Sequence, residues 1–207
     1  MNNTNSKDKI LQIHLHKNSI EVYPLKSSPK TGYKEWELKD LNYFLEEFIT
    51  YFFLKKEVTL ITIKNSFSVF FEEFKGKTPI TITKKRRFFV WEQTKEYVAF
   101  YLSYTTCTNS FIRMMLSEQE WWMDNICLTS LTKKDEMLLK TILEKDLQES
   151  SDITIFSSKT CELIPNFLMP IGDGYGFIFF NPTEGLENAL SKIQELGSKW
   201  EFKIKID

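Results

Sequence analysis

The chain has 207 residues, of which 42% are hydrophobic, and its 27 basic residues nearly balance its 28 acidic ones. This balance excludes a strong overall field toward nucleic acid or an anionic membrane, so any such attraction has to come from a local patch. No stretch approaches 18 apolar residues without charge, and the polar start does not read as a secretory signal, so we expect no membrane association.

The three cysteines, Cys107, Cys127 and Cys161, are widely spaced and odd in number. This pattern argues against both a disulfide framework and a zinc cluster. We therefore expect the protein in the cytoplasm or in another reducing intracellular compartment.

Residues 11–22 predict a β-hairpin, because apolar and polar residues alternate on both sides of the turn sequence at residues 17–19. His14 and His16 fall on the same polar face, at a spacing that a metal ion could use. No third ligand is near in the sequence. We interpret the pair as two histidines on an exposed strand face, and no metal or other cofactor is predicted.

Residues 33–38 predict a short strand, and Asp40 begins a helix whose apolar residues recur at spacings of three and four. The aromatic residues Tyr43, Tyr51 and Phe53 widen the apolar arc of this helix. The helix is therefore either sandwiched in the core or part of a contact surface, and we favour the core.

Residues 57–105 are typical of several strands joined by turns, with an antiparallel meander as the economical topology. Within them, next to aromatic residues, stands the only strong basic cluster of the sequence: Lys84, Lys85, Arg86 and Arg87. Cations beside aromatic rings suit a groove for single-stranded nucleic acid. The alternative is a solvated strand end or hairpin, since four consecutive charges cannot all be buried.

Residues 117–125 predict a short connecting helix, because residues 117–120 have the form of a capping box. This helix divides the chain into two domains. Residues 1–116 form a strand-rich α+β domain with one long helix, and residues 126–207 form the second domain.

In the second domain, residues 173–180 read Asp-Gly-Tyr-Gly-Phe-Ile-Phe-Phe. Seven of these eight positions agree with the signature octapeptide of the RNA-recognition-motif family, which this segment resembles. The exception is Asp173, where the family has a lysine or arginine. Residues 126–131 resemble the hexapeptide on the first strand of the family, with Cys127 replacing the usual aromatic residue.

The elements after residue 126 follow the βαββαβ order of that family. Thr132 caps a helix, residues 152–157 form a strand, and residues 158–172 form a long connection. After the signature strand, Asn181 and Pro182 begin a helix that Gly197 ends. The alternation at residues 200–206 predicts a half-buried terminal strand.

The resemblance, which covers about residues 122–207, implies a ferredoxin-like βαββαβ sandwich. In such a sandwich Tyr175, Phe177 and Phe179 line the face away from the helices and stack on unpaired bases, while Phe180 faces the helices. The binding residues predicted for the second domain are Tyr175, Phe177, Phe179, Lys203 and Lys205. The alternative is a central strand buried on both faces.

No catalytic motif is recognisable, so we predict a non-catalytic binding protein without a small-molecule substrate. Residues 126–207 contain nine lysines, no arginine and thirteen acidic residues, a charge balance that repels phosphate. We therefore favour a protein partner, with RNA as the second ligand class, in a component of a ribonucleoprotein assembly. The alternative function is a small inhibitor, such as an immunity protein or antitoxin, that blocks the surface of its partner.

Overall fold

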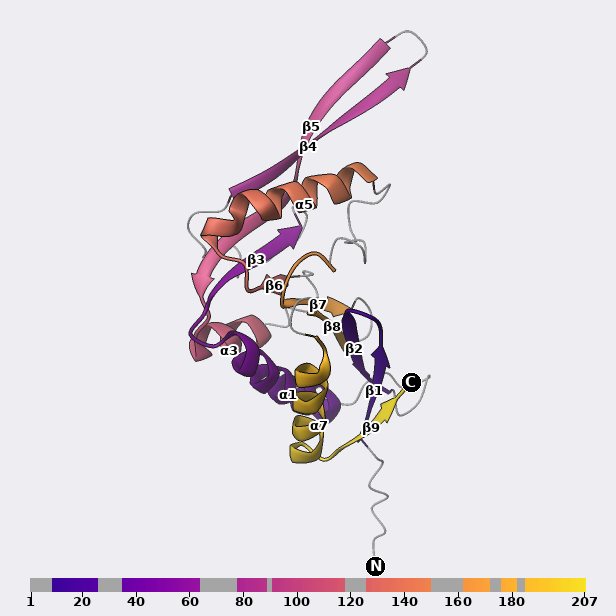
Figure 1. The fold of residues 1–207 in the computed structure, drawn as a ribbon, viewed down its shortest axis with the longest axis vertical. Coiled ribbons are helices and arrows are strands. Elements are labelled where there is room, and N and C mark those ends of the chain that lie inside the picture. The colour runs from indigo at the N-terminus through magenta and orange to yellow at the C-terminus, as the bar shows by residue number, and fades with distance from the viewer. Residues whose placement is uncertain are drawn as a thin grey trace, which may run out of the picture.

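The computed structural model describes residues 9–25, 35–63, 78–88, 91–117, 126–149, 162–171, 176–181 and 185–207. Its elements, shown in Figure 1, are β1 (Lys9–Leu15), β2 (Ser19–Pro24), α1 (Glu35–Phe53), β3 (Glu57–Ile63), β4 (Thr78–Phe88), β5 (Trp91–Thr106), α3 (Asn109–Ser117), β6 (Cys127–Thr129), the 3₁₀ helix η1 (Lys133–Asp135), α5 (Glu136–Glu149), β7 (Phe167–Ile171), β8 (Gly176–Phe180), α7 (Glu187–Lys199) and β9 (Phe202–Ile206). The predicted α+β class is confirmed.

The described strands form one mixed sheet of nine strands in the order β4-β5-β3-β6-β7-β8-β2-β1-β9. Strands from the two predicted domains are neighbours in this sheet. β3 pairs with β6, β2 pairs with β8, and β1 pairs in parallel with β9. The predicted connecting helix lies outside the described residues after Ser117. The domain boundaries stay a prediction. In the shared sheet, each of the two parts supplies neighbouring strands for the strands of the other part.

The ferredoxin-like arrangement is not confirmed, because β7 lies between β6 and β8. In a βαββαβ sandwich the first strand and the signature strand are neighbours. β7 also falls within residues 158–172, where the sequence predicted a long connection. The strand was not predicted because Pro170 is typical of a loop. A proline is tolerated at this position because β7 pairs with β6 through Leu168 and Leu128, which places Pro170 beyond the end of β6. No hydrogen bond between the two strands is therefore lost.

The larger core lies between one face of the sheet and the helices α1, α3 and α7. Two phenylalanines of β8 pack into it. The ring of Phe177 lies 5.2 Å from that of Phe48, and the ring of Phe179 lies 4.6 Å from that of Phe52. These short centroid distances indicate direct ring contact within the core.

The second core lies on the opposite face of the sheet, beneath α5. Leu139 and Leu143 of α5 share it with Phe167, Phe180 and other buried residues of β3, β5 and β6. Successive side chains of a strand point to opposite faces, so β8 places Phe179 in one core and Phe180 in the other.

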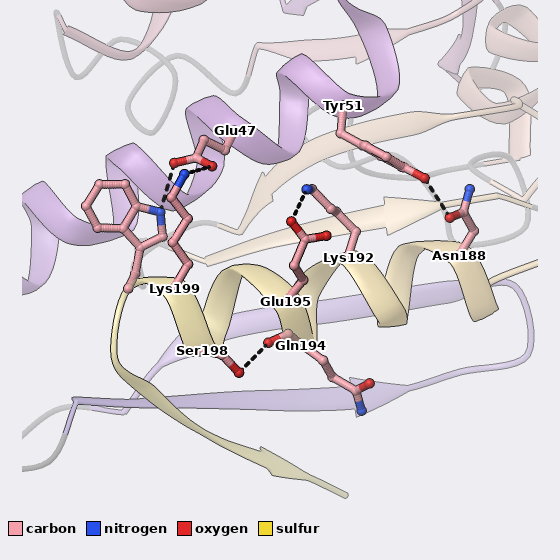
Figure 2. A network of polar contacts seen from close by, with 9 residues as sticks. Glu47, Tyr51, Asn188, Lys192, Gln194, Glu195, Ser198 and Lys199 are labelled. Carbon is pink, nitrogen blue, oxygen red and sulfur yellow. Dashed lines mark hydrogen bonds and ion pairs between the residues drawn. The ribbon is translucent and has the colours of Figure 1, made fainter.

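A row of polar contacts joins α1 to α7 and is drawn in Figure 2. Lys199 Nζ lies 2.6 Å from Glu47 Oε2, and Trp200 Nε1 donates to Glu47 Oε1 at 3.2 Å. One turn further along α1, the Tyr51 hydroxyl donates to Asn188 Oδ1 at 2.9 Å. Glu47 and Tyr51 are four residues apart, so they lie on one face of α1 and hold α7 along it.

The helix predicted at Asp40 exists, but it begins at Glu35, so the predicted strand at residues 33–38 is wrong over its last four residues. Of the aromatic residues that widen its apolar arc, Phe53 is fully buried, whereas Tyr43 and Tyr51 are exposed. Tyr43 stacks on Trp200 with ring centroids 5.2 Å apart. Most of the arc is therefore core, and its edge covers α7.

The predicted helix start at Thr132 is confirmed, because its side chain accepts from the backbone N–H of Lys134 in a capping box. The predicted stop at Gly197 is wrong, since α7 continues to Lys199. Gly197 is buried, and a side-chain carbon there would overlap the side chain of Ile204 on β9. This glycine permits a close helix–strand contact rather than the end of the helix.

Candidate functional site

The candidate site is the face of β9, β1 and β2 that points away from α1 and α7, which we call the outer face. Leu11 and Ile13 of β1 are fully buried toward the helices, so the residues between them point the other way. The register places Lys205 beside Gln12, and Gln12 beside Tyr23. The residues of the outer face are Ile10, Gln12, His14, Glu21, Tyr23, Lys203 and Lys205.

In the described part of the chain, α5 covers the same side of the sheet only at its other end. The core beneath α5 includes residues of β3, β5, β6, β7 and β8, but none of β1, β2 or β9. Figure 1 shows α5 beside β3, well away from β1 and β9. Lys203 and Lys205 are both exposed.

A polar network holds the side chains of the outer face. His14 Nε2 lies 2.5 Å from the Tyr23 hydroxyl, and the two rings stack with centroids 5.3 Å apart. Asp207, which follows β9, accepts a bond from Gln12 and has an oxygen 3.8 Å from His14 Nε2. The His14 side chain is 36% exposed, so part of this arranged pair remains open to a partner.

Burial raises the pKa of the Tyr23 hydroxyl, and the nearby carboxylates of Glu21 and Asp207 raise it further. Tyr23 therefore keeps its proton at neutral pH and remains able to donate a hydrogen bond. His16 Nε2 lies 3.5 Å from Glu21 Oε2. Within the described ranges, no three His, Cys, Asp or Glu residues are grouped so that they could hold a metal ion. The arrangement suits recognition through hydrogen bonds, charge and ring contact.

Gly176 of the signature strand lies beside Tyr23 in this layer. A side-chain carbon on Gly176 would lie 2.6 Å from the Val22 carbonyl oxygen and 2.7 Å from Tyr23 Cβ. Real side-chain carbons do not approach other atoms so closely. The glycine thus leaves room for the neighbouring strand of the same sheet.

The predicted aromatic surface is corrected by the structure. Phe177 and Phe179 are both 0% exposed, because α1 packs on the face of β8 that the resemblance left open. They are core residues and offer no surface for stacking. Tyr175 lies outside the described residues. β8 is therefore buried on both faces, as the alternative interpretation of the sequence held.

The basic cluster Lys84, Lys85, Arg86 and Arg87 lies within β4, paired with residues 92–95 of β5. The structure describes the backbone of this segment and not its side chains. Figure 1 shows β4 and β5 as a long ribbon that extends beyond α5. Because β4 and β9 are opposite edges of the sheet, the two predicted groups of basic residues do not meet.

The sequence analysis missed Gln12, Tyr23 and Asp207 as site residues. Alternation within residues 11–22 and 200–206 already indicated two polar strand faces. What it could not indicate is that β9 pairs with β1, nearly the whole chain away, and so joins these faces.

A second polar cluster joins β5 to α5. The Tyr104 hydroxyl donates to Glu136 Oε2 at 2.9 Å, and Lys140 Nζ lies 3.0 Å from Glu136 Oε1. Lys133 also contacts Glu136, and its Nζ lies 4.6 Å from the centre of the Tyr104 ring. A pocket of about 200 Å³ beside the cluster is lined in part by Glu57, Tyr104 and Lys133. Since the charged groups pair with each other, the cluster clamps α5 to the sheet.

Replacing Glu136 by glutamine is expected to weaken this clamp in a pH-dependent way. The bonds from Lys133 and Lys140 lower the pKa of Glu136 from 4.5 to about 2. A carboxylate with a lowered pKa stabilises the fold above pH 4.5, and this contribution disappears as the pH falls toward 2. We expect E136Q to lower the free energy of unfolding by about 1 kcal/mol at pH 7 and by almost nothing near pH 2.

Urea unfolding followed by circular dichroism at both pH values measures this effect. E144Q, which changes an exposed residue of the same helix, is the matched control. An equal loss of stability at pH 7 and pH 2 would contradict the role given to the Glu136 charge.

None of the helices in the described ranges is long and apolar enough to cross a membrane. A comparison of the chain with protein-family models, curated proteins and solved structures finds no match.

Proposed function

We propose that this chain is a non-catalytic binding protein that recognises a partner protein through its outer face. The observation that carries the proposal is that exposed Lys203 and Lys205 share the outer face with the stacked pair His14 and Tyr23. These side chains stand on strands whose opposite face is packed in the larger core. A rigid support lowers the entropy lost on binding.

The charge of the outer face favours protein over RNA as its ligand. Glu21 and Asp207 lie on the same face of the sheet as the two lysines, and carboxylates on this face repel phosphate groups. Tyrosine is instead enriched in protein interfaces, whose rims are polar. Exposed lysines then serve partner choice and the rate of encounter.

The double change K203E/K205E is expected to abolish capture of the partner while the protein stays folded. Both side chains are exposed, so the reversal removes attraction for an acidic partner without opening the core. The measurement is an affinity pull-down from extract of the native host, with and without ribonuclease. Each variant is first checked by its thermal melt.

The matched control is K56E/K145E, which reverses two exposed lysines away from the outer face. Capture that resists ribonuclease, survives in the control and is lost in K203E/K205E supports the proposal. Equal capture by all three proteins would contradict it. If the captured protein is an enzyme that the chain inhibits, the inhibitor class is supported over the assembly class.

A second candidate function, contact with single-stranded RNA, is favoured by the ribbon of β4 and β5. Residues 83–96 of this ribbon hold five basic and two acidic residues, and Figure 1 shows that the far part of the ribbon extends beyond α5. Basic residues next to aromatic residues in the sequence, as at residues 84–91, are what binding of single-stranded nucleic acid needs. In a ribonucleoprotein assembly the ribbon would contact RNA while the outer face holds a protein.

Replacing Lys84, Lys85, Arg86 and Arg87 together by alanine is expected to weaken RNA binding and to flatten its dependence on salt. Each lost phosphate contact removes about 0.7 from the slope of log affinity against log salt for a single strand. Fluorescence anisotropy with a labelled oligouridine, measured over a series of salt concentrations, tests this. An unchanged affinity and slope would assign the cluster to a solvated strand, and K203E/K205E is the matched control.

A further inference from the structure

The outer edge of β9 is a free strand edge in the described sheet. β9 is the last strand of the sheet order and pairs on one side only, with β1. The Asp207 N–H donates to the Ile13 carbonyl at 3.0 Å, so the backbone of this residue is turned toward β1. Backbone groups alternate in direction along a strand. Those of Lys203 and Lys205 therefore face β1, and those of Ile204 and Ile206 point outward.

The sequence of β9 leaves this edge able to pair. Phe-Lys-Ile-Lys-Ile contains no proline, and β9 pairs with β1 in an unbroken register. Edges that are closed to partners carry prolines or bulges, or are covered by another element. The two lysines are the feature of β9 that discourages pairing with another strand. They repel a strand with basic residues and attract a strand with acidic ones.

A second copy of the chain is a poor occupant of the edge. Two copies related by a twofold axis would align their β9 strands antiparallel and place lysines opposite lysines. Like charges directly opposite on paired strands are destabilising. An incoming strand with acidic residues at the same places would instead pair with Lys203 and Lys205 on the outer face.

The other face of the edge offers an apolar contact. Ile206 is 44% exposed, and Leu15 of β1 is 41% exposed. Leu15 shares this face with Ile13, which is the register partner of Ile206, so the two exposed side chains lie at the same end of the two strands. A strand laid along β9 would cover Ile206 with a residue that alternates with its acidic ones, and Leu15 continues this apolar surface on β1.

From these observations we infer that the free edge of β9 binds an extended segment of the partner protein, in which acidic residues alternate with apolar ones. The segment adds a tenth strand to the sheet. Its backbone pairs with Ile204 and Ile206, its acidic side chains meet Lys203 and Lys205, and an apolar side chain meets Ile206. This strand addition rests on the proposed function, because it states how the partner of the outer face is held.

The probe is a short synthetic peptide in which glutamate alternates with valine, added to the isotope-labelled full chain. We expect the amide signals of Ile204 and Ile206 to shift and their exchange with solvent to slow. A peptide in which lysine alternates with valine is expected to cause neither change. Absence of shifts in β9, shifts at the β4 edge instead, or equal binding of the lysine peptide would each overturn the inference.

A pair of variants separates backbone pairing from side-chain contact. I206P removes the outward N–H and leaves the bonds to β1, whereas I206A shortens the side chain and keeps the N–H. We expect I206P to bind the glutamate peptide about fivefold more weakly than I206A does, because it lacks one further edge hydrogen bond. Equal affinities of the two variants would overturn strand addition. Should I206P fail to fold, the shift map of the unaltered chain decides alone.

The same variants distinguish failure of this inference from failure of the proposed function. If K203E/K205E loses its partner in the pull-down while I206P captures it as well as I206A does, the outer face binds a protein without strand addition. If K203E/K205E also keeps its partner, the outer face is excluded as the binding site and the proposed function fails.

Discussion

F179A is expected to lower the free energy of unfolding by about 3–5 kcal/mol, the range found when large core side chains are cut to alanine. Phe179 is fully buried, and its ring lies 4.6 Å from that of Phe52 and 5.3 Å from that of Phe48. Removing it leaves a cavity between β8 and α1 that a packed core cannot close completely. Urea unfolding followed by circular dichroism measures the loss.

The control for this prediction is I178A, which changes the adjacent, partly exposed residue on the other face of β8. We expect it to cost clearly less, because less apolar surface leaves contact with the protein. F180A is expected to cost as much as F179A, since Phe180 is buried in the core beneath α5. If F179A proved as stable as I178A, Phe179 would instead lie on a surface, as the family resemblance implied.

Residues 126–207 expressed alone are expected not to fold. In this fragment β6 loses β3, β8 loses β2, and β9 loses β1. Phe177 and Phe179 also lose the aromatic residues of α1 that bury them. The fragment would leave apolar surface exposed and strand edges unpaired. The free energy that this costs is larger than the stabilisation that the core of so small a unit supplies.

The measurement is a thermal melt together with a two-dimensional amide spectrum of the fragment. We expect no cooperative transition and poorly dispersed signals for the fragment alone. Adding residues 1–125 is expected to restore a cooperative melt and a well-dispersed spectrum. A dispersed spectrum and a cooperative melt of the fragment alone would show that the second part is an independent domain. The intact chain is the control for both measurements.

Local periodicity was enough to predict most of the elements. The alternation around residues 17–19 predicted β1 and β2, and spacings of three and four predicted α1, α5 and α7. These patterns are readable because each element buries one face wherever it lies. β7 was not predicted because Pro165 and Pro170 are typical of a loop. A proline is compatible with a strand where the neighbouring strand has ended, and the sequence does not show where β6 ends.

The sequence by itself determined that a strand lies within residues 173–180, with aromatic side chains on both faces, and that a strand with a lysine face lies within residues 200–206. Only the tertiary structure decided which of these faces is covered. α1 lies on Phe177 and Phe179, and β9 lies beside β1, which brings the lysines onto the same face as His14 and Tyr23. Alternation can be read from one strand alone. Burial of a face depends also on which distant segment packs against that face, and local alternation does not specify this segment.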